Sequence, residues 1–202
     1  NQKLEPKSVR GLILAPTREL AKQISDNLKG FVQNTPLKIG LVVGGASINP
    51  QIARVARGID ILVATPGRLI DLLDRRVLSL HATTFLVLDE ADQMLDLGFI
   101  HSLRKIAGML PQTRQTMLFS ATMPKQMNEL ANSYLQNPMR VEVSPPGKAA
   151  DKITQSIHFI SKAEKTKLLI ELIDKHRDEL ALVFSRTRHG AEKLMKTLDK
   201  SG

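Results

Sequence analysis

Three acidic residues follow directly on a short apolar run near the middle of the chain. Phe85–Leu88 is too short for a helix and contains a β-branched residue, which is typical of a strand buried on both faces. Asp89, Glu90 and Asp92 come straight after it. Open α/β sheets bind ligands beyond the carboxyl ends of their strands, so these carboxylates are placed to bind a ligand. Acidic side chains at a helix N-terminus also interact favourably with the helix dipole. This interaction explains one or two carboxylates after the strand but not the order Asp-Glu-Ala-Asp.

Turns with phosphate-binding character follow three further apolar runs. Val9–Leu14, Lys38–Val43 and Ile59–Ala64 each have the length and composition of a strand, and each leads through a turn into a helix. A helix N-terminus offers unpaired N–H groups and partial positive charge to a phosphate. Right-handed crossovers between parallel strands would bring the turns to one edge of the sheet, which predicts a track for a nucleic-acid backbone. The residues of these turns are Pro16, Thr17 and Arg18, then Gly44 and Gly45, then Thr65, Pro66, Gly67 and Arg68.

Each turn also has a purely structural interpretation. Thr17 and Thr65 are suitable N-caps, and Pro66 suits a first helical position. A glycine pair after a strand is ordinarily a tight turn, and the helix after it is expected to have Asn49 as its N-cap. Arg68 is the one residue that this interpretation does not require.

Composition narrows the class of protein. The 202 residues are 42% hydrophobic, enough for a folded core, and carry a net charge of +9 with a pI near 9.9, which favours a polyanionic partner. Only 3% are aromatic, so backbone contacts with weak sequence preference are expected in place of base stacking. No cysteine is present, which excludes disulfides and suits the cytosol. The five histidines are scattered singly, without metal-like spacing, and no apolar stretch has the length of a membrane span.

The motifs together resemble one protein family. Asp89–Asp92 resembles the Walker B signature of the DEAD-box RNA helicases, and the run Asp89–Phe99 (DEADQMLDLGF) resembles the bacterial RhlE-type branch of that family. Ala15–Leu20 (APTREL), the glycine pair and Thr65–Arg68 (TPGR) are similar to motif Ia, the GG element and motif Ib, which contact the RNA backbone in that family. Ser120-Ala121-Thr122 (SAT) falls where the family has motif III.

This resemblance implies a fold and a reaction. The fold would be α/β, a RecA-like parallel sheet flanked by helices, and the parent protein would be an ATP-dependent RNA helicase with ATP and Mg²⁺ as cofactors. Asp89 would hold Mg²⁺ mostly through water, since Mg²⁺ dehydrates reluctantly, and Glu90 would position and deprotonate the attacking water. Asp92 would bond the hydroxyls of Ser120 and Thr122, which would link the nucleotide to RNA binding. The turns named above would grip one RNA strand.

Beyond the acidic strand the pattern continues and then changes. Ile100–Leu110 is expected to be a helix, and Gln115–Phe119 and Met139–Val143 are expected to be strands of a first domain that spans residues 1–143. Residues 144–151 are rich in Pro, Gly and polar residues, which is typical of a linker. Residues 152–202 would begin a second RecA-like domain. Its expected features are a strand at Ile153–Ile160, a capping box at Ser161–Glu164, a buried strand at Leu180–Phe184 and, in a run that resembles motif IV, the RNA contact Arg186.

Several parts of the resembled family are not among these residues. No G-x-x-x-x-G-K-[ST] sequence occurs, although this loop supplies the phosphate cradle and a Mg²⁺ ligand in P-loop ATPases. In the family that loop and the Q motif precede motif Ia, and motifs V and VI follow motif IV. We therefore expect a fragment that is inactive alone, with a strand missing between Gln115–Phe119 and Met139–Val143. Two alternatives stay open, a non-catalytic RNA-binding or scaffold protein of helicase descent and a DNA-directed translocase of superfamily 2.

Overall fold

The structure is a computed structural model that describes residues 8–143 and 153–200. The chain divides into two units, Asn1–Lys148 and Ala149–Gly202. The expected linker at residues 144–151 lies outside the described residues.

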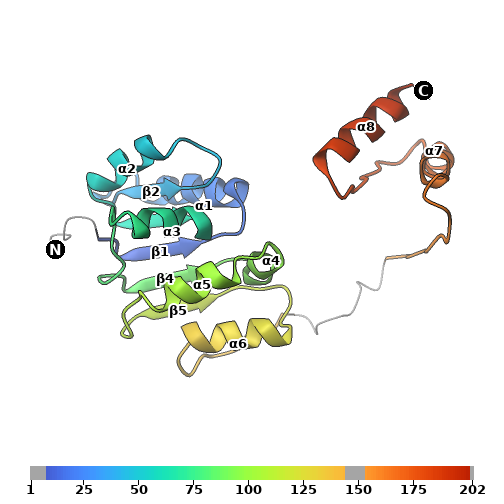
Figure 1. The fold of residues 1–202 in the computed structure, drawn as a ribbon. Helices are drawn as coiled ribbons and strands as arrows, with labels where there is room; N and C mark the ends of the chain where they lie inside the picture. Colours follow the sequence, from blue (N-terminus) through green and yellow to red (C-terminus); the bar gives the residue numbers. More distant parts are fainter. Residues whose placement is uncertain (1–7, 144–152, 201–202) are drawn as a thin grey trace. The chain divides into compact units, whose positions relative to one another are not determined.

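Five parallel strands form the sheet of the first unit, in the order β2-β3-β1-β4-β5. Figure 1 shows β1, β4 and β5 of this sheet following one another. The central strand β1 pairs with β3 on one side and β4 on the other, so the chain crosses over β1 on its way from β3 to β4. Ligands bind at such a switch point in open α/β sheets. The expected parallel α/β sheet is confirmed, with strands shorter than the apolar runs that predicted them: β1 (Gly11–Leu14), β2 (Ile39–Val42), β3 (Ile61–Ala64), β4 (Phe85–Leu88) and β5 (Gln115–Leu118).

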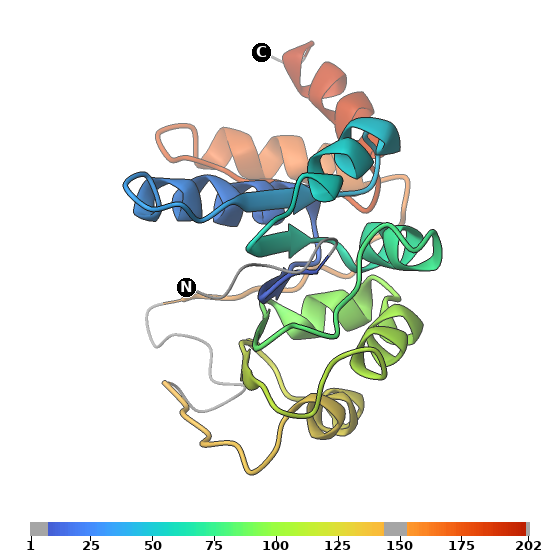
Figure 2. The same ribbon diagram turned by 90° about the vertical axis from the view of Figure 1, so that its left-hand side faces the viewer.

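Helices cover the two faces of this sheet unequally. One face carries α1, and the other carries α2, α3 and α5 (Figure 2). The side chains of α6 belong to the same core as those of α3 and α5. The helices are α1 (Arg18–Phe31), α2 (Ile48–Ala56), α3 (Pro66–Asp74), α4 (Ala91–Asp96), α5 (Ile100–Ala107) and α6 (Lys125–Tyr134).

Alternate residues of β1, β2 and β3 belong to different cores, as the two-residue period of a strand requires. Leu12, Leu14, Leu86 and Leu88 are fully buried in the larger core with the residues of α3, α5 and α6. Ile13 packs instead against the smaller core on the α1 side. Burial on both faces explains why β1 is apolar throughout and lies in the middle of the sheet.

Within the described residues of the first unit, no helix covers the α1 face over β4 and β5. Pairing places Ile13 beside Val87 and Val87 beside Met117, so Met117 lies on the α1 side. Phe85 and Phe119 lie two residues from these positions on their strands and share that face. Phe85, Met117 and Phe119 are 55%, 43% and 53% exposed. This exposed apolar patch is typical of a surface that contacts another part of a protein.

Three sequence predictions in the first unit are corrected. The N-cap of α2 is Ser47, and Asn49 lies inside the helix. The predicted helix at 100–110 ends at Ala107, three residues early. Residues 139–143 do not form a strand, and Met139 and Val143 are 90% and 97% exposed. A strand needs a neighbour for its backbone hydrogen bonds, and β5 pairs only with β4 in the described part of the chain.

The second unit contains two helices among its described residues, α7 (Lys165–Lys175) and α8 (Arg188–Asp199). The strands predicted at 153–160 and 180–184 are wrong, because both segments lack strand pairing. Phe159, Leu180 and Phe184 are each more than 85% exposed, at 94%, 106% and 88%. Alternating apolar residues become a strand only when other strands supply hydrogen bonds, and no described segment of this unit does so.

The capping box of the second unit forms only in part. The backbone N–H and the hydroxyl of Ser161 both donate to the Glu164 carboxylate, at 3.2 and 2.6 Å. The helix nevertheless begins at Lys165, with Glu164 and not Ser161 as its N-cap. Across the helices that the structure describes, none combines the length and the apolar character that crossing a bilayer would require.

Candidate nucleotide and nucleic-acid site

All five strands of the first unit end in one row. Because pairing is parallel and in register, Val42, Ala64, Leu14, Leu88 and Leu118 lie side by side across the sheet. The turns that follow them therefore share the carboxyl edge, as expected from the sequence. This edge carries Thr17 and Arg18, Gly44 and Gly45, Thr65, Asp89 and Glu90, and Ser120.

Asp89 and Glu90 turn the chain from β4 into α4. The N–H of Asp89 donates to the Leu14 carbonyl at 3.0 Å, and its carboxylate accepts the N–H of Glu90 at 3.1 Å. Glu90 has left-handed backbone angles, φ 49° and ψ 52°, and its exposed side chain forms no capping hydrogen bond. This conformation costs a non-glycine residue about 1–2 kcal/mol, and such strain gathers at functional sites. The Glu90 carboxylate is therefore held at the edge without a structural task.

Asp92 joins the end of β4 to the end of β5. Its carboxylate accepts the backbone N–H and the hydroxyl of Thr122, both at 2.8 Å. Its own N–H donates to the Ser120 hydroxyl oxygen at 3.3 Å, and that hydroxyl donates to the Thr122 carbonyl at 2.7 Å. The expected link between Asp92 and the SAT segment is present in the structure.

These contacts set the ionisation of Asp92. Partial burial opposes the charged form, but hydrogen bonds from Thr122 and from the Gln93 N–H outweigh it and hold the pKa of Asp92 below its usual range. Asp92 is therefore a carboxylate at neutral pH, and its lone pairs are engaged by the protein. It is a connecting residue, in contrast to the exposed Glu90.

Asp89 and Glu90 form the acidic edge of the sheet, which suits a cation that also has phosphate oxygens and water as ligands. Within residues 8–143 and 153–200 no three acidic or histidine side chains converge on one point. Asp89 is a single half-buried carboxylate. Mg²⁺ is commonly bound by one or two carboxylates together with phosphate oxygens and water. The donor set fits Mg²⁺ bound with a nucleotide and does not fit a cage made of protein alone.

Arg18 and Gly45 bring the first two turns together. A Cβ added to Gly45 would lie 2.5 Å from Nη1 of Arg18, so the guanidinium rests against the glycine. Gly45 also has φ 71°, a left-handed angle that favours glycine. Thr17 caps α1 as predicted, since its hydroxyl oxygen accepts the Leu20 N–H at 3.2 Å. The Arg18 side chain is 53% exposed, and its Nη2 lies 3.7 Å from the carboxylate of Glu19.

Thr65 and Arg68 point into the protein, unlike Arg18. Thr65 is 7% exposed, and its hydroxyl oxygen accepts the Gly44 N–H at 3.3 Å and makes no cap for α3. The Arg68 side chain is 11% exposed, and its Nη2 donates to the Ala46 carbonyl at 3.0 Å. Both side chains make hydrogen bonds to the loop between β2 and α2, residues Val43–Ser47, which is called the glycine loop below. The other members of these turns shape the backbone: Pro16, Pro66 at the first position of α3, and Gly67.

Sequence reasoning missed Gln51. Its side-chain amide is buried, at 9% exposure, and makes hydrogen bonds to Val43 and Ser47 on the two sides of the glycine pair. The signal that could have found it is its position, because Gln51 falls on the buried stripe of α2 with Ile48 and Val55. A buried polar side chain needs partners, and a glycine loop beside it supplies them.

Arg186 belongs to the second unit. It is exposed and directly precedes Thr187, the N-cap of α8. The Thr187 hydroxyl oxygen accepts the Gly190 N–H at 3.0 Å. Within its own unit, Arg186 is thus a solvent-facing cation at the start of a helix.

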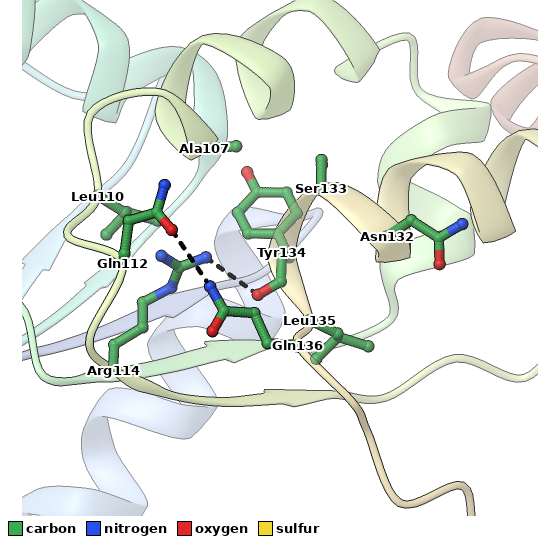
Figure 3. A pocket seen from close by; sticks show the side chains of 9 residues that line it. All are labelled: Ala107, Leu110, Gln112, Arg114, Asn132, Ser133, Tyr134, Leu135 and Gln136. Carbon is green, nitrogen blue, oxygen red and sulfur yellow. Dashed lines mark hydrogen bonds between the residues drawn. The ribbon is translucent and has the colours of Figure 1, made fainter.

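A pocket of about 250 Å³ lies away from this site, beside the amino end of β5 (Figure 3). Arg114 spans it and donates to the Tyr134 carbonyl at 3.0 Å, to the Thr116 hydroxyl oxygen at 3.1 Å and to the Pro111 carbonyl. The Tyr134 hydroxyl donates to the Leu103 carbonyl at 2.6 Å, and burial raises the pKa of Tyr134. These bonds tie the end of α6 to α5 and, through Arg114, to β5. The lining has no acid or histidine: Ala107, Leu110, Gln112, Arg114, Asn132, Ser133, Tyr134, Leu135 and Gln136.

The chain is similar in sequence to proteins of one known family. Residues 1–130 match the family model described as DEAD/DEAH box helicase. The chain belongs to this family. The ATP-dependent RNA helicase RhlB of Shewanella frigidimarina (strain NCIMB 400) is 42% identical over 195 residues, which are 96% of this chain and 45% of that protein. RhlB of Shewanella sp. (strain MR-4) is 41% identical over 195 residues, 96% of this chain and 44% of that protein.

A solved helicase structure confirms the fold of this DEAD/DEAH box chain. The crystal structure of a hypothetical ATP-dependent RNA helicase from Sulfolobus tokodaii superposes with a TM-score of 0.59 at 37% identity. The match covers 65% of this chain and 39% of that one. The sheet is therefore the RecA-like sheet that the sequence resemblance implied. The chain spans less than half the length of the curated relatives named above.

Proposed function

We propose that this chain is the central part of an ATP-dependent RNA helicase that couples ATP hydrolysis to local unwinding of RNA duplexes or to remodelling of RNA–protein complexes. The observation that carries the proposal is the bonding of Asp92 to Thr122, which joins the acidic end of β4 to the end of β5. Membership of the DEAD/DEAH box family and the names of the RhlB relatives support it.

The acidic edge would serve ATP hydrolysis. Bound ATP and Mg²⁺ would supply the phosphoryl group and neutralise its developing charge. Asp89 would hold the metal, mostly through water, and Glu90 would orient the attacking water and take its proton. The unengaged, exposed carboxylate of Glu90 suits that task. The 202 residues hold no P-loop sequence for the phosphates, so hydrolysis is proposed for the whole protein and not for this chain alone.

The turns that contain Arg18, Gly45 and Arg68 would bind the RNA backbone with little sequence preference. Arg18 would pair with a phosphate, since its guanidinium is half exposed beside the glycine loop. Thr65 and Arg68 would act through the loop that they hold. Arg186 would contribute from the second unit. The net charge of +9 favours this partner.

The proposal extends to the domain bounds of the chain, its branch of the family and its location in the cell. Residues 1–143 would be part of RecA-like domain 1, residues 144–151 a linker, and residues 152–202 the start of domain 2. The RhlE-type branch stays a prediction that rests on the run Asp89–Phe99, since the relatives named above are RhlB proteins. The absence of cysteine supports a cytoplasmic location.

RNA-stimulated ATP hydrolysis by this chain, measured beside the whole protein, tests the proposal. We expect only the whole protein to hydrolyse ATP, and we expect both the whole protein and this chain to bind RNA. RNA binding without hydrolysis in either would favour the non-catalytic alternative. Hydrolysis by the 202 residues alone would contradict the need for a P-loop, and stronger competition by DNA than by RNA would favour the translocase.

A further inference from the structure

The loop between β2 and α2 is held at every residue from Val43 to Ser47. The Gly44 N–H is bonded by Thr65, and the Ala46 carbonyl is bonded by Arg68. Gly45 lies under the guanidinium of Arg18. The two ends of the loop, Val43 and Ser47, are both bonded by one side chain, that of Gln51.

Gln51 uses both ends of its amide in these bonds. Oε1 accepts the Val43 N–H at 3.0 Å, and Nε2 donates to the Val43 carbonyl at 3.2 Å and to the Ser47 carbonyl at 3.0 Å. Only an amide offers an acceptor and two donors in this geometry. With 9% exposure, Gln51 cannot exchange these partners for water without cost.

We propose that Gln51 is a positioning residue that fixes the glycine loop so that the backbone N–H groups of Gly45 and Ala46 and the Arg18 guanidinium face one phosphate group of bound RNA. The inference rests on the proposed RNA-binding function. No hydrogen bond among the described residues uses the N–H of Gly45 or of Ala46. Two such donors beside a half-exposed arginine form a concave anion-binding arrangement. Gln51 touches no RNA in this account and acts through the loop.

Two substitutions of similar size test the role of the amide. Gln51→Glu keeps an acceptor but loses both donors, and Gln51→Met removes all three bonds without adding charge. The same substitutions at Gln126, which is exposed on α6, are the matched controls. Each variant of the full 202-residue chain is titrated into a fluorescein-labelled oligouridylate, and binding is followed by anisotropy. Amide hydrogen exchange of residues 43–47 and of β3 is measured on the same samples without RNA.

Both Gln51 variants are expected to bind the oligouridylate about tenfold more weakly, and both Gln126 variants should bind as the original chain does. Exchange of the Val43 and Gly44 amides should accelerate, while β3 stays protected. Unchanged affinity and unchanged loop exchange would overturn the inference while leaving RNA binding intact. Weaker binding by Gln51→Glu alone would assign the effect to charge and overturn it as well. If the original chain shows no binding, the RNA surface itself is refuted, and the inference falls with it.

Discussion

The carboxylate of Asp92 accepts two hydrogen bonds from Thr122 at 2.8 Å, one from the backbone N–H and one from the hydroxyl. Asp92 lies in the first turn of α4, two residues after Glu90, and Thr122 follows the end of β5. A displacement of the acidic turn therefore pulls on the segment after β5. This bond is the physical connection that a coupling of hydrolysis to RNA binding would require at this edge.

Replacing the hydroxyl of Thr122 tests the strength of this connection. Thr122→Val keeps the shape and the backbone N–H but removes one donor to Asp92, and it should lower the free energy of unfolding by about 1 kcal/mol. Thr113→Val is the control, because Thr113 is exposed in the turn before β5. Urea unfolding monitored by circular dichroism gives both values. Equal small losses in the two variants would mean that the hydroxyl bond contributes nothing to stability.

The lowered pKa of Asp92 predicts a pH dependence of stability. Since the pKa is lower in the folded state than in the unfolded chain, ionised Asp92 stabilises the fold above the unfolded value of about 3.9. That stabilisation is lost as the pH falls through the folded pKa. Asp92→Asn should therefore destabilise the chain most at neutral pH, and the difference from the original chain should shrink in acid. Thermal unfolding from neutral pH to about pH 3 measures it. A difference that stays constant over that range contradicts the assignment.

The left-handed backbone of Glu90 predicts a gain of stability on substitution by glycine. Glu90→Gly should raise the free energy of unfolding by up to about 1 kcal/mol, because glycine adopts φ 49° without a Cβ clash. Arg76, at φ 54°, lies outside the site and provides the control. Arg76→Gly should stabilise by a similar amount and leave ATP hydrolysis by the whole protein unchanged, whereas Glu90→Gly should abolish hydrolysis. Loss of stability in Glu90→Gly alone would show that its side chain supports the fold.

The two glycines of the loop should respond differently to an added methyl group. Gly45→Ala meets both a left-handed φ of 71° and the Arg18 guanidinium at 2.5 Å, so it should cost about 1–2 kcal/mol of stability. Gly44→Ala finds no atom within 4 Å and should change stability by less than about 0.5 kcal/mol. Thermal unfolding of both variants decides this. Equal losses would mean that the contact with Arg18 does not define the loop.

Local sequence signals were sufficient for the parts of the site that depend on single strands and turns. The apolar run Phe85–Leu88 and the acids after it predict β4 and its edge, and the strand forms because β1 and β5 lie beside it to share backbone hydrogen bonds. The prediction that this strand is buried on both faces is wrong, since Phe85 is 55% exposed on the α1 side. Thr17 was predicted as an N-cap because capping is decided within one turn of helix. The link between Asp92 and the SAT segment came from the family resemblance and not from such local signals.

Signals that depend on partners distant in sequence were not sufficient. The directions of Thr65 and Arg68 are set by the loop of a different strand, so the turn alone could not reveal that both side chains are buried. Gln51 was overlooked for the same reason. The segment Leu180–Phe184 has the composition of a buried strand but no described strand beside it, and it stays unpaired and exposed. Composition indicates whether a segment favours a strand, and pairing with a neighbouring strand decides whether that strand forms.

Glu90→Gln in the whole protein tests whether the carboxylate of Glu90 acts in ATP hydrolysis. The substitution keeps size and removes the charge that would take a proton from the attacking water. RNA-stimulated ATP hydrolysis and RNA affinity should be measured on the same preparation, with Gln126→Glu, an exposed change on α6, as the control. Glu90→Gln is expected to abolish hydrolysis and to leave RNA affinity within about twofold of the original protein. Hydrolysis at the original rate would contradict it.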